Sequence, residues 1–67
     1  MSATRKDFVK IAASVSTTLA LCETPGERAV VCHLARNLAV DLRGMNSNFD
    51  RYRFLSACGL TLEEMDR

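Results

Sequence analysis

Apolar side chains recur at helical spacing along the first third of the chain. They fall on one face of a helix, in an arc about 100° wide at 100° per residue: Phe8, Ile11, Ala12, Val15 and Leu19. Thr4 and Asp7 stand before this pattern at the spacing of a capping box, which marks a helix N-terminus. We therefore predict a helix over about residues 5–21.

A longer apolar pattern follows, and it begins with the strongest local signal in the sequence. Thr24, Pro25 and Glu27 are residues favoured at the N-cap, the first and the third positions of a helix. Beyond them, apolar residues at 4-3-4-3 spacing form a heptad seam: Val31, Ala35, Leu38, Leu42 and Met45. The pattern predicts a helix over about 25–43, with Gly44 as its C-cap.

This second helix has more apolar surface than one neighbouring helix covers. Val30 and Leu34 widen the seam on one side, and Cys32 and Ala39 widen it on the other. The total apolar arc is about 200°, roughly twice what one neighbour requires. Either the first and third helices together cover this arc, or part of it is a protein interface, most simply with a second copy in a symmetric dimer.

The C-terminal third repeats these signals on a smaller scale. With Asp50 as N-cap, Phe49 and Phe54 occupy the two positions of a hydrophobic staple. Gly59 is a residue type that commonly follows the end of a helix. Together these residues predict a short helix over about 51–58.

Thr61 and Glu64 make a further capping box, which predicts a terminal turn over about 62–66. No β-type alternation occurs in the sequence. We therefore predict a single all-α domain, 1–67, that consists of an antiparallel helical hairpin, a shorter third helix and the terminal turn. The core of so short a chain rarely supplies more than about 3–5 kcal/mol, which favours a homodimer.

Composition and charge narrow the class of protein. Hydrophobic residues make up 48% and charged residues 25%, as is typical of a folded domain. The net charge of +1 weighs against an electrostatically driven nucleic-acid binder. Three cysteines without a CxxC pair favour reduced thiols in the cytoplasm. Asp7 and Lys10 interrupt a signal-peptide core, and no run of about 18 apolar residues exists, so we expect neither a signal peptide nor a membrane partner.

Residues capable of chemistry do not form a recognisable constellation. Cys32 and His33 are adjacent and would point about 100° apart on a helix, so they offer no face with two metal ligands. Asp50 has no second carboxylate at a fixed offset and serves more simply as an N-cap. Cys58 fits a buried apolar thiol. We therefore predict that the protein is not an enzyme and has no catalytic residue, metal site or cofactor.

Arg51, Tyr52 and Arg53 form a basic edge at the start of the third predicted helix. A helix-turn-helix reader places such residues in the major groove of DNA, so a DNA-binding regulator is one hypothesis. The alternative interpretation is that the two arginines pair with acids of the same chain, such as Asp50 or, near the C-terminus, Glu63 and Glu64. The low net charge and the opposition of arginine to the helix dipole mean that we do not favour a nucleic-acid partner.

Two short segments, one near each end of the chain, follow a pattern known elsewhere. The first is Arg5-Lys6-Asp7-Phe8 and the second is NSNFDRYRFLSACG. The matching positions of the second segment are Asn46, Phe49, Asp50, Arg51, Phe54, Leu55, Ala57, Cys58 and Gly59. The pattern resembles that of very small bacteriophage and prophage proteins that end in Asn-Pro-x-Phe-Asp-Arg-x-x-Phe-hydrophobic-x-Ala-Cys-Gly. Ser47 stands where proline is usual.

The resemblance implies a phage or prophage origin but no particular activity. Very small phage proteins bind and disable host machinery such as CRISPR effectors, restriction systems and transcription factors, and this is an analogy between classes only. By that analogy we expect a non-enzymatic protein of the host cytoplasm that binds and modulates or inhibits a host protein, in host takeover or anti-defence. The residues predicted to bind the partner are Val30, Leu34, Arg36, Arg51, Tyr52 and Arg53.

Overall fold

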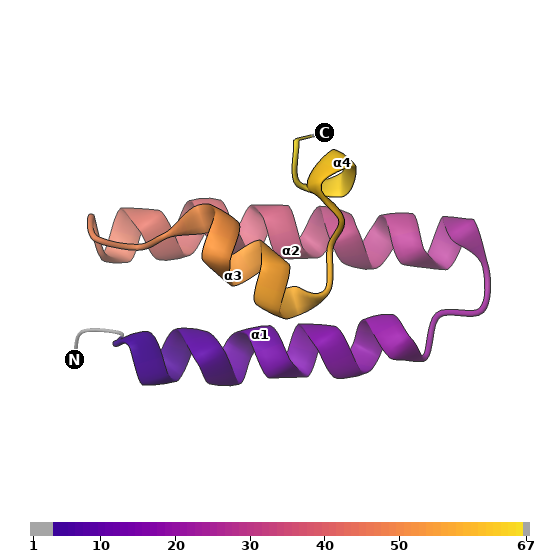
Figure 1. Cartoon of the computed structure of the whole chain (residues 1–67), viewed down its shortest axis with the longest axis horizontal. Coiled ribbons are helices and arrows are strands. Elements are labelled where there is room, and N and C mark those ends of the chain that lie inside the picture. Colours follow the sequence, from indigo (N-terminus) through magenta and orange to yellow (C-terminus); the bar gives the residue numbers. More distant parts are fainter. Residues whose placement is uncertain (1–3, 67) are drawn as a thin grey trace.

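A computed structural model describes residues 4–66, which form four helices and no strand. The helices are α1 (Arg5–Ala20), α2 (Pro25–Met45), α3 (Arg51–Cys58) and the short α4 (Leu62–Met65) (Figure 1). This confirms the predicted all-α domain, with an antiparallel hairpin and a shorter third helix. The ends of each helix lie within two residues of the predicted ones. The homodimer stays a prediction.

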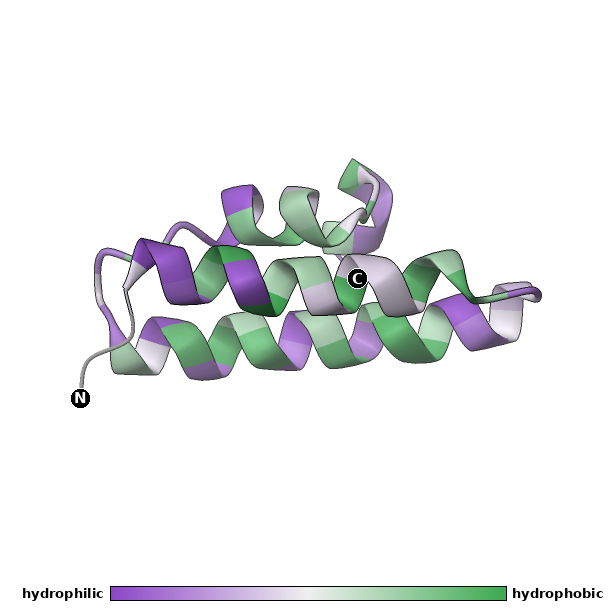
Figure 2. Ribbon diagram, turned by 90° about the horizontal axis from the view of Figure 1, so that it is seen from below, coloured by the Kyte–Doolittle hydropathy of each residue, from purple (hydrophilic) through white to green (hydrophobic). Residues whose placement is uncertain are grey.

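The hairpin of α1 and α2 sets the length of the molecule. A helix rises about 1.5 Å per residue, so the 21 residues of α2 account for most of the longest extent of 36 Å. α3 runs across the front of the hairpin, and α4 lies next to α2 (Figure 1). Figure 2 shows α3 and α4 on the same side of the two long helices. Within the described part of the chain, the opposite side of the hairpin has no covering helix.

Side-chain caps explain where α2 and α3 begin. The Thr24 hydroxyl accepts a hydrogen bond from the Glu27 N–H at 3.1 Å. The Glu27 carboxylate accepts in turn from the N–H groups of Thr24 at 3.1 Å and Glu23 at 2.8 Å. At α3, the Asp50 carboxylate accepts from the Arg53 N–H at 3.1 Å. These bonds satisfy backbone donors that a helix start leaves without a helical partner.

The two glycines predicted to end helices behave differently. Gly59 ends α3 with a φ of 98°, a backbone angle that L side chains rarely adopt. A Cβ at Gly59 would also lie 3.3 Å from Cδ2 of Leu19. The prediction that Gly44 caps α2 is wrong, because α2 continues past it and Asn46 is the C-cap. The Asn46 N–H donates to the Leu42 carbonyl, so the last helical hydrogen bond forms beyond the glycine.

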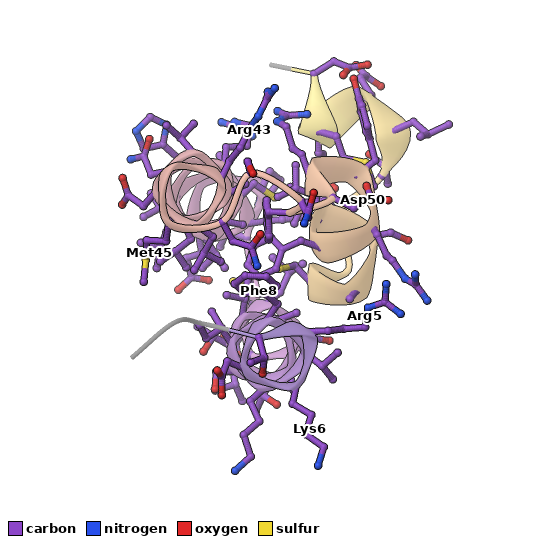
Figure 3. The ribbon with its side chains drawn as sticks, turned by 90° about the vertical axis from the view of Figure 1, so that its left-hand side faces the viewer. Arg5, Lys6, Phe8, Arg43, Met45 and Asp50 are labelled. Atoms are coloured by element: carbon purple, nitrogen blue, oxygen red, sulfur yellow. The ribbon has the colours of Figure 1, made fainter. Side chains whose placement is uncertain are left out.

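Helix α3 supplies the two largest fully buried side chains of the core. Leu55 and Cys58 have exposed fractions of 0%. Viewed along the hairpin, Phe8 points into the space between α1, α2 and α3 (Figure 3). Its ring meets that of Phe49 edge-on with centroids 4.8 Å apart, and the centroid of Phe54 lies 5.3 Å from that of Phe49. The buried core residues are Ala12, Val15, Leu19, Cys32, Ala35, Ala39, Leu42, Phe49, Phe54, Leu55, Cys58, Leu60 and Met65.

The buried face of α2 differs from the predicted heptad seam. Its buried residues are Cys32, Ala35, Ala39 and Leu42. Val31 and Leu38 of the predicted seam are only half-buried, and Met45 is 61% exposed. The prediction that Met45 belongs to the seam is therefore wrong. The core is rotated toward Cys32 and Ala39 because α3 and α4 pack against that flank of α2.

Truncation of the deepest core side chain tests this packing. Leu55→Ala should lower the free energy of unfolding by about 2–5 kcal/mol, because the site loses buried apolar area and leaves a cavity. Leu62→Ala, at a residue 75% exposed, is the control and should change the free energy by about 0.5 kcal/mol or less. Urea denaturation followed by circular dichroism measures both. Equal effects of the two substitutions would contradict the assignment of Leu55 to the core.

Candidate functional site

One apolar face of the hairpin is left uncovered. It lies on α2, away from α3 and α4, and we call it the bare face. Its exposed members are Val30 (70%), Leu34 (53%) and Met45 (61%). Val31 and Leu38 border it; they are half-buried and pack against the core. Figure 3 shows Met45 pointing away from α3. The structure therefore brings the predicted residues Val30 and Leu34 together on one surface, and adds Met45 to them.

Helix periodicity places Val30, Leu34 and Leu38 in one row, and Asp41 separates this row from Met45. Leu34 and Leu38 follow Val30 at steps of four residues, and Met45 falls in the same arc, about 100° wide at 100° per residue. A contiguous apolar row distinguishes an interaction surface from single exposed apolar residues, which are common on any protein. Val40 is such a single residue: it is 67% exposed but lies about 120° around the helix from Leu34.

The charges within the arc of the bare face are acidic. Glu27 and Asp41 fall there at 100° per residue, and both are exposed. Hydrogen bonds from two backbone N–H groups at the start of α2 lower the pKa of Glu27, so this carboxylate is ionised at neutral pH. The arginines of α2 fall on other parts of its circumference: Arg28, Arg36 and Arg43. Figure 3 shows Arg43 and Met45 pointing in different directions from the end of α2.

On the opposite flank of α2, arginine side chains hold the C-terminal segment. Arg28 donates two hydrogen bonds to the Glu64 carboxylate, from Nε at 2.7 Å and from Nη2 at 2.9 Å. Arg36 donates to the main-chain carbonyl of Glu64 at 2.9 Å, and Arg51 donates to that of Met65. We call these five residues the C-terminal clasp. Two residues predicted to bind a partner, Arg36 and Arg51, are thus engaged within the chain.

The clasp fixes the protonation state of Glu64. The hydrogen bonds from Arg28, followed by one from the Thr61 N–H, lower the pKa of the Glu64 carboxyl from 4.5 to about 2. The neighbouring Cys32 thiol responds in the opposite sense, because burial first and the charge of Glu64 second raise its pKa. At neutral pH the ion pair is therefore formed beside a protonated thiol.

The sequence revealed only half of the role of Glu64. The predicted capping box is present: the Thr61 hydroxyl accepts from the Glu64 N–H at 3.3 Å, and the Glu64 carboxylate accepts from the Thr61 N–H at 2.8 Å. The same carboxylate also binds Arg28, which is 36 residues away in sequence. The sequence offered one signal for this contact: Arg28 lies one helical turn before Cys32, on the flank of α2 that the structure buries.

In the predicted basic edge of α3, Arg51 contacts the C-terminal segment whereas Arg53 is exposed to solvent. Arg51 turns to the C-terminal clasp and lies over the Tyr52 ring, 5.3 Å from its centroid. The Tyr52 hydroxyl lies 3.4 Å from the carboxylate of Asp66. The Arg53 side chain is exposed. Within residues 4–66 neither arginine forms an ion pair, contrary to the alternative interpretation, and DNA binding stays a prediction.

The two segments that resemble phage proteins meet in space. Phe8 comes from the first segment, and its ring packs on that of Phe49 from the second. Phe54, also from the second segment, continues the aromatic cluster. The two segments therefore form a single packed junction between α1 and α3. The family resemblance itself stays an expectation.

The thiols and the histidine do not converge on a reactive centre. Burial raises the pKa of Cys58 to about 11, so its thiol is protonated at neutral pH. His33 lies exposed on α2. Within residues 4–66, no three side chains of the His, Cys, Asp and Glu types lie close enough together to hold a metal ion.

Comparisons of the chain with protein-family models, with curated proteins and with solved structures found no match. Among the described helices, none combines the length and the apolar composition that crossing a membrane requires.

Acid titration tests the ion pair of the C-terminal clasp. The pKa of Glu64 is depressed in the folded state, so its contribution to stability is complete above about pH 4.5 and is lost as the pH falls toward 2. Glu64→Gln should lower the melting temperature by about 2–5 °C at pH 7. The difference from the unsubstituted protein should shrink as the pH approaches 2, and circular dichroism melts measure it.

Glu23→Gln is the matched control, because it removes one exposed carboxylate from the link between α1 and α2. Its melting temperature should follow that of the unsubstituted protein across the same pH range. A difference between Glu64→Gln and the unsubstituted protein that is the same at pH 2 and pH 7 would show that the ion pair is not its source.

Proposed function

We propose that this chain is a small non-enzymatic interaction protein that binds a host protein through the bare face and thereby modulates or inhibits it. The observation that supports the proposal is the set of exposed apolar side chains, Val30, Leu34 and Met45, on the side of α2 that faces away from α3 and α4 (Figure 3). A domain of this size gains stability from covering such a row. The phage-type role is the one that the resemblance to small phage proteins implies.

The spacing of the row suits a helical partner. Apolar residues at steps of four along Val30, Leu34 and Leu38 form a ridge on α2. An amphipathic helix of the partner can lay its own apolar stripe beside this ridge, with anchors at i, i+3, i+4 and i+7. Glu27 and Asp41 then lie next to the partner's flanks, so the complementary flanks are basic. The proposed partner element is therefore an amphipathic helix edged with lysine or arginine.

The homodimer predicted from the sequence would use the same face. In a homodimer the apolar rows of the two copies would pack against each other, which favours association. This arrangement would also bring Glu27 and Asp41 of both copies to an interface whose α2 faces hold no arginine or lysine. Like charges at an interface oppose association. We therefore propose a weak homodimer that a basic partner replaces.

A charged substitution in the row tests the binding of a host protein. Leu34→Glu should weaken binding at least tenfold, because it places an unpaired carboxylate in the apolar contact. Tagged unsubstituted protein and Leu34→Glu are used as baits in a bacterial host lysate, and retained proteins are identified by mass spectrometry. The expected result is a protein held by the first bait and lost from the second.

Val40→Glu provides the matched control for this experiment. It introduces the same charge on the same helix at a residue of similar exposure, 67% against 53%, outside the bare face. It should retain the partner, and both variants should keep the helical circular dichroism spectrum. A partner lost equally from both variants, or retained equally by both, would rule out the bare face as the binding surface.

Light scattering tests whether two copies of the chain form the proposed homodimer. The mass of the unsubstituted chain should rise with concentration from 7.4 kDa toward twice that value at tens of micromolar. Leu34→Glu should remain at the mass of one chain. An unsubstituted protein that stays monomeric would contradict the homodimer, whereas the binding of a host protein would be unaffected by that result.

A further inference from the structure

A second possible site lies between α1 and α3, on a different part of the surface from the bare face. A cavity of about 410 Å³ opens there, bordered by the first turns of α1, the segment between α2 and α3, and α3 itself. Pockets that bind small molecules have volumes of about 300–1,000 Å³. In contrast to the bare face, the lining includes aromatic rings and two arginines.

Aromatic rings form the apolar part of the lining. The Phe49 ring packs between those of Phe8 and Phe54, with ring centroids 4.8 Å from Phe8 and 5.3 Å from Phe54. Phe49 and Phe54 are buried in the core, which holds the cluster in place, and Phe8 is half-buried. A void of about 150 Å³ already holds a benzene ring. The cavity therefore has room for one planar ring beside the cluster, with space left for a substituent.

The charged part of the lining has an excess of positive charge. Arg5 of α1 and Arg53 of α3 border the cavity, and Asp50 is the acidic residue among the lining side chains. One Asp50 oxygen accepts the Arg53 N–H at the start of α3. Within residues 4–66, neither the Arg5 nor the Arg53 guanidinium has a hydrogen bond or an ion pair. Figure 3 shows Arg5 on the side of α1 that faces α3.

We propose that this cavity binds a small aromatic anion. The planar ring packs against the phenylalanine cluster, where edge-to-face contacts favour another aromatic ring. The anionic group, a phosphate or a carboxylate, lies between Arg5 and Arg53, whose guanidinium groups form charge-assisted hydrogen bonds with either group. The cavity shares no residue with the bare face, so the two proposals stand independently.

Nuclear magnetic resonance titration of the ¹⁵N-labelled chain tests the proposal. Phenyl phosphate should cause saturable shifts of the backbone amides of Asn48, Phe49 and Ala57, with a Kd on the order of 1 mM or tighter. Inorganic phosphate provides the charge alone and phenol the ring alone, and each should bind at least tenfold more weakly. Benzoate distinguishes the anionic group, because its binding in place of phenyl phosphate assigns the site to carboxylates and supports the proposal equally.

Substitutions at the two arginines complete the test. Arg5→Gln and Arg53→Gln should each weaken phenyl phosphate binding about tenfold, since each removes a charge-assisted hydrogen bond. Both side chains are exposed, so the fold is retained, and the unliganded spectra verify this. Lys6→Gln is the control, because Lys6 points away from α3 (Figure 3) and its loss should change Kd less than twofold.

Three results would overturn the proposal. The first is an absence of saturable shifts with both phenyl phosphate and benzoate. The second is binding of inorganic phosphate as tight as that of phenyl phosphate, which would mean that the ring makes no contact. The third is equal weakening by Lys6→Gln and Arg53→Gln, which would mean that the anion responds to the net charge of the surface.

Discussion

The burial of Leu55 and Cys58 against the hairpin is the interaction on which the other features depend. It holds α3 on one flank of α2, and that choice decides which part of the apolar arc becomes core and which becomes the bare face. It also places Arg51 beside the C-terminal segment and puts α3 at the border of the cavity between α1 and α3. A helix of eight residues is too short to be stable alone, so α3 depends on these buried contacts in return.

Local signals in the sequence were sufficient to predict where the helices lie, but not which face of each helix is buried. The caps at Thr24, Asp50 and Thr61 each involve residues three positions apart, so the sequence shows both partners at once. The buried face of α2 depends on where α3 docks, and periodicity shows only that the apolar arc is wide. The heptad interpretation therefore placed Met45 in the core, whereas the structure buries Cys32 and the alanines of the other flank.

Only part of the candidate surface could be predicted, because the exposed residues of α2 also depend on where α3 docks. Val30 and Leu34 are exposed because they lie at the edge of the arc that is farthest from α3. Arg36 and Arg51 looked available for a partner, since a long cationic side chain near a surface is usually solvated. Their actual acceptors are main-chain carbonyls of the last described residues, and no sequence pattern reports the position of a carbonyl oxygen.

The clasp has a consequence for how the end of this chain can vary. Two of its arginines bind oxygens of the main chain, which every amino acid supplies, and only Arg28 depends on the identity of a side chain, Glu64. Substitutions at outward-facing positions of α4, such as Leu62, therefore leave all three anchors in place for as long as the helical turn forms, and replacement of the Glu64 side chain leaves two. The outer surface of the C-terminal turn can therefore carry different side chains while the attachment of the turn to the rest of the domain is retained.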